Sequence, residues 1–169
     1  LEMLLHDLEQ KGPSSYIYFQ LGQNYISLND MEKAAHFYKL GLDLNADPNS
    51  AFVQSMAETY GYCLMDLARY DLAMSLKDKY EQFSHRADFV FLMGTLYMKK
   101  GNYDKAIEEF QKATTLTAYS RTGVNSYRAN YHIASIYETL NKPEEAILYY
   151  KKCGDYEPAK RRLKELSAT

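Results

Sequence analysis

The sequence predicts an all-helical protein built as an array of about four helix–turn–helix units. Apolar and small residues recur at helical spacing on both sides of a Gly-Asn turn in residues 91–113. The same pattern returns three more times, and the second-helix alanines at positions 34, 73, 106 and 146 are separated by 39, 33 and 40 residues. Such periods are typical of repeat proteins, in which each helix pair stacks on its neighbours. The composition agrees, because 4 Pro and 8 Gly leave few helix breaks.

The first 48 residues are expected to form a docking helix and the first repeat. In residues 1–12, four leucines share one helical face, and Pro13 then stops the helix. The first repeat spans residues 15–48, with Ser14 or Ser15 predicted to cap its first helix and Asp30 its second. This half of the chain therefore has clear start signals.

The second repeat, residues 49–86, is the weakest copy. Its first helix is expected to run to about Leu67, and the chain then turns through Ala68 and Arg69 without a good cap. One second helix is predicted from Tyr70 to about Phe83.

The third repeat with its loop covers residues 87–126, the fourth residues 127–156 and a capping helix residues 157–169. In the third, Gly101 is expected to end the first helix and Asn102 to cap the second. The longest irregular stretch, residues 117–126, follows, and insertions of this kind sometimes bind partners. Pro143 fits the first turn of the last second helix, where a missing N–H costs little.

Composition argues against several classes of partner. A net charge of −2 gives no electrostatic reason to expect nucleic acid, and the basic residues of the last helix are interpreted as a solvated capping face. No apolar run approaches the roughly 20 residues that span a bilayer. Cys63 and Cys153 lack disulfide or metal-ligand spacing, so reduced thiols, and with them a cytoplasmic location, are expected.

No constellation for catalysis, metal or cofactor binding emerges. The four histidines fall in different repeats without the spacing of a zinc site, and no Walker-type loop, GxSxG or GxGxxG motif occurs. We therefore expect this segment not to be an enzyme.

The chain resembles the tetratricopeptide repeat family, and residues 91–113 carry the best match. The resemblance implies a right-handed α-solenoid of about four units with terminal helices. The copies are degenerate, because the aromatic residue expected near the start of the first helix is Tyr18 in the first copy but is replaced in the others by Ala57, Val90 and Asn130.

In that family the first helices line a concave groove that binds a protein or peptide. The resemblance places these residues on it: Tyr16, Phe19, Gln20, Gln23, Glu58, Thr59, Tyr62, Met65, Phe91, Leu92, Thr95, Met98, Arg128, Tyr131, His132, Ser135 and Glu138. The alternative for each aromatic residue is packing between repeats. The cation clamp for chaperone tails is missing, since the corresponding positions hold Phe19, Gln23, Thr59, Asp88 and Leu92.

A narrower resemblance concerns residues 122–153 and the opening residues 1–25. They look like the tetratricopeptide region that follows the catalytic domain of bacterial family 2 glycosyltransferases. This would imply a parent enzyme with a nucleotide-sugar donor and a metal-binding Asp-x-Asp, which does not occur in these 169 residues. Two hypotheses therefore stand: a module that positions an acceptor or partner, or self-associates, for an attached transferase, and a stand-alone scaffold or regulatory adaptor.

Overall fold

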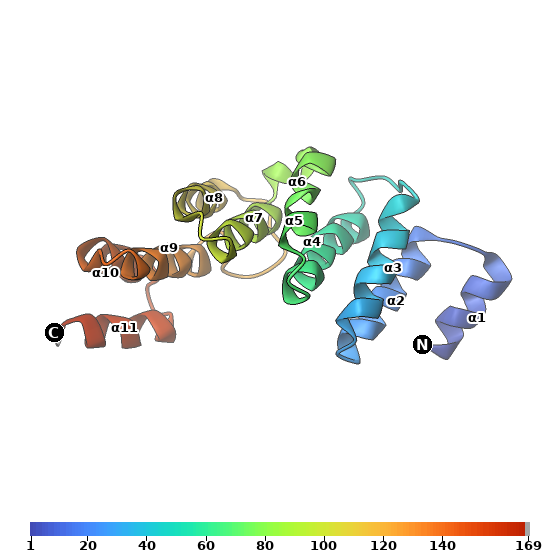
Figure 1. The fold of residues 1–169 in the computed structure, drawn as a ribbon, viewed down its shortest axis with the longest axis horizontal. Helices are drawn as coiled ribbons and strands as arrows, with labels where there is room; N and C mark the ends of the chain where they lie inside the picture. Colours follow the sequence, from blue (N-terminus) through green and yellow to red (C-terminus); the bar gives the residue numbers. More distant parts are fainter. Residues whose placement is uncertain (168–169) are drawn as a thin grey trace. The chain divides into compact units, whose positions relative to one another are not determined.

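A computed structural model describes residues 1–167, in which every regular element is a helix (Figure 1). The chain divides into two compact units, residues Leu1–Gln82 and a second unit that begins at Phe83. The elements of the first unit are α1 (Glu2–Lys11), α2 (Ser15–Ser27), α3 (Met31–Asp43), α4 (Ala51–Asp66), α5 (Tyr70–Met74) and α6 (Leu76–Lys79). After the 3-10 helix η1 (Glu81–His85), the second unit holds α7 (Ala87–Lys99), α8 (Tyr103–Thr115), α9 (Tyr127–Thr139), α10 (Pro143–Lys151) and α11 (Glu157–Ser167). The prediction of an all-helical fold is confirmed.

Helix pairs form because a small residue on the first helix faces a ring on the second. A Cβ built on Gly22 of α2 would lie 2.3 Å from the Tyr38 ring of α3, and one on Gly94 of α7 would lie 2.9 Å from the Phe110 ring of α8. Tyr38 and Phe110 are fully buried, so the glycines allow the two helix backbones of each pair to approach closely.

The four first helices end in the same way. The residue after each C-cap has a positive φ, and these residues are Asn29, Ala68, Gly101 and Asn141. In each case this residue and the next donate backbone hydrogen bonds to carbonyls three and five residues earlier, as Ala68 does to Met65 and Arg69 to Leu64. This is the Schellman motif, and it reverses the chain within two residues.

Caps of the second helices agree with the sequence, whereas the predicted serine cap is wrong. The Asp30 carboxylate accepts from the Lys33 N–H at 3.0 Å, and Asn102 accepts from the Lys105 N–H at 3.4 Å. Ser14 occupies the N-cap position of α2 without a side-chain cap bond. Ser15 is buried, and its hydroxyl donates to the Gly41 carbonyl at 2.7 Å instead.

The predicted second helix from Tyr70 to Phe83 is also wrong, because the structure breaks this segment into α5, α6 and η1. At the first break the Ser75 hydroxyl donates to the Leu72 carbonyl at 2.7 Å. A serine that binds a nearby carbonyl competes with the helical ladder. Ser75 thereby interrupts the second helix of the second repeat. Among the second helices of the first three repeats, this is also the one that starts without a side-chain cap, at Arg69.

The irregular stretch after α8 is tied to the start of α7. Asp88 is buried, and its carboxylate accepts from the backbone N–H groups of Ser120 and Arg121 at 2.7 and 2.8 Å. The Ala87 N–H donates to the Ala118 carbonyl at 2.8 Å. The insertion is therefore a pinned loop, and Asp88 has a structural role.

Candidate functional site

The predicted groove residues fall on α2 and α4 in the first unit and on α7 and α9 in the second. Each set is described within its own unit. A groove that continues across both units stays a prediction.

The first unit has a cavity of about 420 Å³ between its first helices. Two predicted residues, Gln23 of α2 and Thr59 of α4, line it together with Ile26, Ser27 and Tyr38. The Tyr38 ring reaches this wall because Gly22 has no side chain in its path. The lining combines hydroxyl and amide groups with apolar surface and holds no charged residue. Such a hollow suits an uncharged side chain of a ligand.

Aromatic rings gather at the start of the same two helices. Tyr16 has about half of its surface exposed and lies edge-on to Phe52 of α4, with ring centroids 5.4 Å apart. Phe19 contacts both Phe52 and Tyr38 and is 9% exposed, so it belongs to the core, which was the alternative for the aromatic residues. Gln20, Tyr62 and Met65 keep part of their surface exposed, whereas Glu58 is buried.

In the second unit, three predicted contacts are core residues. Leu92 has no exposed surface, and Phe91 and Thr95 are 4% and 7% exposed. The Thr95 hydroxyl donates to the Phe91 carbonyl within α7. Side chains buried to this degree stabilise the helix stack and leave little surface for a ligand. The reason is the length of the apolar run in α7, which is buried on all sides from Ala87 to Leu96.

The partly buried ring of His132 packs against this core. Its ring stacks on Phe110 at 5.1 Å and contacts Phe91 edge-on at 5.3 Å. The Arg128 guanidinium lies 5.8 Å from the centre of the Phe91 ring, one helical turn before His132. Burial, together with the charges of Arg128 and Lys99, lowers the pKa of His132 to about 4. The imidazole is therefore neutral at pH 7 and sits in a positive field.

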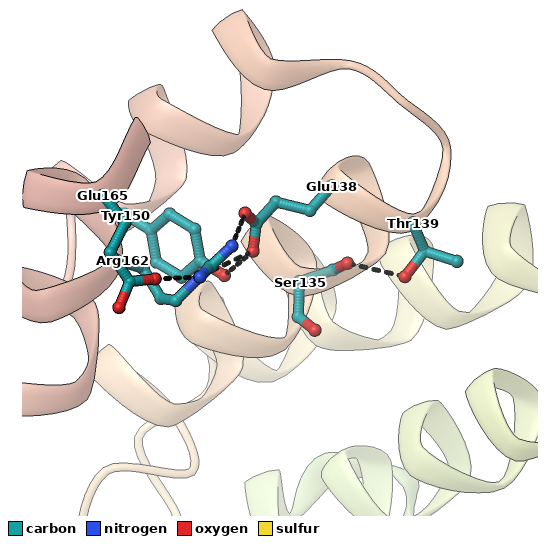
Figure 2. A network of polar contacts seen from close by, with 6 residues as sticks. All are labelled: Ser135, Glu138, Thr139, Tyr150, Arg162 and Glu165. Carbon is teal, nitrogen blue, oxygen red and sulfur yellow. Dashed lines mark hydrogen bonds and ion pairs between the residues drawn. The ribbon is translucent and has the colours of Figure 1, made fainter. Parts of the chain in front are cut away.

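At the other end of α9, Glu138 is engaged by the capping helix (Figure 2). It accepts hydrogen bonds from Arg162 at 2.5 Å and from the Tyr150 hydroxyl at 2.6 Å. Burial raises the pKa of Glu138, but these hydrogen bonds outweigh it and hold the pKa below its usual value. Arg162 also contacts Glu165. Glu138 therefore holds α11 in place and is not free to select a ligand.

The remaining predicted positions of the second unit are partly accessible. Tyr131 is half-buried against Tyr150 and Tyr156, and Ser135 and Met98 are half-buried. The Ser135 carbonyl accepts from Thr139 within α9 (Figure 2).

The described residues hold no cluster of three or more metal-ligating side chains, and no helix among them is long and apolar enough to cross a membrane. Cys63 and Cys153 are buried, and burial raises their pKa values to about 12 and about 11. The thiols are therefore protonated and poorly nucleophilic at pH 7.

Sequence reasoning missed Ile26, Ser27 and Phe52, and it did not include Lys99. Ile26 and Ser27 lie three and four residues after Gln23, so helical spacing alone puts them on the same face. Phe52 opens α4 at the position where Tyr16 stands in α2, and only the contact between them identifies it.

Comparisons with known proteins agree with this architecture. Tetratricopeptide repeat family models match residues 15–48 and residues 89–153. A curated relative, "Regulatory protein RapG" of Bacillus subtilis (strain 168), is 23% identical over 137 residues, which are 80% of this chain and 37% of that protein. The chain thus spans little more than a third of that relative.

Two solved structures have the same fold. "Crystal structure of YrrB: a TPR protein with an unusual peptide-binding site" superposes with a TM-score of 0.74 at 17% identity, over 98% of this chain and 80% of that one. MamA from Desulfovibrio magneticus RS-1 gives a TM-score of 0.73 at 18% identity, over 96% and 82% of the two chains.

Proposed function

Because the chain belongs to the tetratricopeptide repeat family, with matches over more than half of its residues, we propose that it is an interaction module that binds a peptide or protein on its first helices. The cavity of about 420 Å³ between α2 and α4 is the observation that carries this proposal. It is bordered by Gln23 and Thr59, which family geometry assigns to the ligand-binding side. A small hollow lined by hydroxyl, amide and apolar groups suits a peptide side chain.

One solved structure supports a ligand of this class, and one curated relative supports a regulatory role. The solved structure of YrrB is described as having an unusual peptide-binding site, and RapG is named a regulatory protein. A stand-alone scaffold or regulatory adaptor fits these relatives directly. The proposed role is binding, because the feature that carries it is a cavity between helices and both thiols are buried.

A narrower proposal comes from the sequence resemblance to the region after the catalytic domain of bacterial family 2 glycosyltransferases. In it, the module positions an acceptor or partner for an attached transferase, or joins two copies, in the bacterial cytoplasm. The narrower proposal is supported if the product of the full open reading frame turns over a nucleotide-sugar and if this activity is lost when a sheet-forming domain upstream of residue 1 is deleted. An open reading frame without such a domain overturns it.

The interaction proposal is tested with peptides selected from a displayed random library on the purified chain. Thr59→Arg places a long charged side chain in the cavity, whereas His36→Arg places the same side chain on the exposed surface of α3 and serves as the control. We expect Thr59→Arg to weaken the selected peptides at least tenfold and His36→Arg to leave their affinity unchanged. Equal affinities in both variants, with circular dichroism showing intact folds, would overturn the proposal.

A further inference from the structure

The face that α7 and α9 share carries positive charge without an acidic counterpart. Lys99 and Arg128 are exposed, and neither forms an ion pair within residues 1–167. The two acidic residues of these helices are both occupied. Asp88 is buried against the backbone N–H groups of the insertion loop, and Glu138 is bound by Arg162 and Tyr150. The face therefore keeps two uncompensated cations.

The groups around His132 are consistent with a positive electrostatic field on this face. Three elements face its ring: α7 with Phe91 and Lys99, α8 with Phe110, and α9 with Arg128 and Tyr131. None of these groups is acidic. Burial first, and then the two cations, disfavour a proton on the imidazole and lower its pKa. A negative ligand on this face would relieve that repulsion.

The spacing of the two cations indicates how many carboxylates fit. Arg128 lies over Phe91, and Lys99 follows Phe91 by eight residues on the same helix, which corresponds to about 12 Å along the axis. Two cations anchored that far apart along the helix can take one carboxylate each. Two acidic side chains four residues apart in an extended chain are about 13 Å apart, at about 3.3 Å per residue.

We propose that the α7–α9 face of the second unit binds an internal acidic segment of a protein partner, with Arg128 and Lys99 each holding one side-chain carboxylate. This inference rests on the proposed interaction function and names the chemistry of its ligand. Arg128 suits this role, because its guanidinium lies over the Phe91 ring, 5.8 Å from the ring centre, and a planar guanidinium can donate two parallel hydrogen bonds to a carboxylate. Half-buried Tyr131 and Met98 offer apolar surface beside the charges.

The test uses blocked peptides in which Glu alternates with Tyr, and a twin in which Gln replaces every Glu. A third peptide carries Gln side chains and a free C-terminal carboxylate. Binding is measured by calorimetry to the whole chain, to Arg128→Gln, to Lys99→Gln and to the double variant. Lys112→Gln and Lys151→Gln remove the same charge from the exposed sides of α8 and α10 and are the matched controls.

We expect the Glu peptide to bind and each single variant to lose about two- to fivefold in affinity, the usual range for an exposed ion pair, with about tenfold lost in the double variant. Arg128→Lys should restore part of the loss. The bound Glu peptide should also raise the pKa of His132, measured by NMR, in the whole chain but not in the double variant.

Three outcomes overturn the inference. The first is that the Gln twin binds as well as the Glu peptide. The second is that the control variants lose as much affinity as the double variant, and the third is that the peptide with only a terminal carboxylate binds best. If library-selected peptides still bind and are sensitive to Thr59→Arg, the interaction function stands while the acidic ligand is refuted. If the acidic peptides only change a concentration-dependent self-association of the chain, its ligand on this face is a second copy and the inference also fails.

Discussion

Replacing Ala68 with glycine should stabilise the chain. Ala68 is the exposed residue after the C-cap of α4, and it holds φ at 56°. The three corresponding turns use Asn29, Gly101 and Asn141, which tolerate this left-handed conformation better. A Cβ in this region costs about 1–2 kcal/mol, and glycine removes that strain.

The gain is reduced by the unfolded state. Glycine adds unfolded-state entropy worth about 0.4–1 kcal/mol, so the net stabilisation is about 0.5–1 kcal/mol. Because the Ala68 methyl group is exposed, little burial is lost. For a chain of this length the change raises the Tm by about 2 °C. Ala68→Asn should lie between alanine and glycine, and Ala68→Val should destabilise because a β-branched residue is strained at positive φ.

Urea and thermal unfolding followed by circular dichroism measure these differences. Ala51→Gly is the matched control, because Ala51 is also exposed but opens α4 with an ordinary negative φ. It should lose up to about 0.5–1 kcal/mol, since glycine is a poor helix former. If Ala68→Gly destabilises as much as Ala51→Gly, or if Ala68→Val is harmless, the turn is not strained and the reasoning is refuted.

Three further predictions concern packing and titration. Gly22→Ala should lower the free energy of unfolding in urea by about 1–3 kcal/mol, because its Cβ would lie 2.3 Å from the buried Tyr38 ring. Gly41→Ala, whose Cβ meets the flexible Met56 side chain, should lower it less, and the opposite order would contradict this reasoning. The pKa of His132 falls from 6.5 in the unfolded chain to about 4 in the folded chain, so its contribution to stability should be complete above pH 6.5 and lost as the pH falls towards 4. His132→Phe keeps a stacked ring and should flatten the dependence of the unfolding free energy on pH between 4 and 6.5. An unchanged dependence would contradict the lowered pKa of His132. Glu138→Gln should speed hydrogen exchange of the α11 amides at pH 7 relative to Glu144→Gln on the exposed side of α10. Because its partners lower the pKa of Glu138, α11 of the unchanged chain should loosen as the pH falls below 4.5, and this pH dependence should be absent in Glu138→Gln. Equal exchange in both variants would show that Glu138 does not hold the helix.

The burial of Phe91 and Leu92 changes how the binding surface has to be tested. Phe91→Ala removes a ring that is 4% exposed and contacts both Phe110 and His132. Such truncations cost about 3–5 kcal/mol, so loss of binding in this variant would reflect unfolding. Substitutions at the exposed charges Arg128 and Lys99, and at the cavity residue Thr59, test binding without removing core.

Local chemistry explains what the sequence alone determined. The helix pairs, the positions of their turns and the caps at Asp30 and Asn102 depend on residues within five positions of each other. Spacing of three and four residues and a residue that accepts positive φ are visible in any single copy. The family resemblance adds the prediction that the first helix of each pair faces the ligand, and two residues named on that basis, Gln23 and Thr59, line the cavity of the first unit.

The tertiary structure alone decided which of those residues remain available. Phe19, Phe91 and Leu92 look like contacts on a helical wheel, but neighbouring helices cover them. Glu138 looks free until Arg162, 24 residues later, binds it. The break at Ser75 likewise depends on its hydroxyl donating to the Leu72 carbonyl. A serine within a helix can make this bond or leave the helical hydrogen bonds intact, so the sequence does not predict which occurs. Burial and ion pairing depend on residues distant in sequence, and a repeat pattern with a period of 33 to 40 residues specifies that neighbours stack without specifying which side chains they cover.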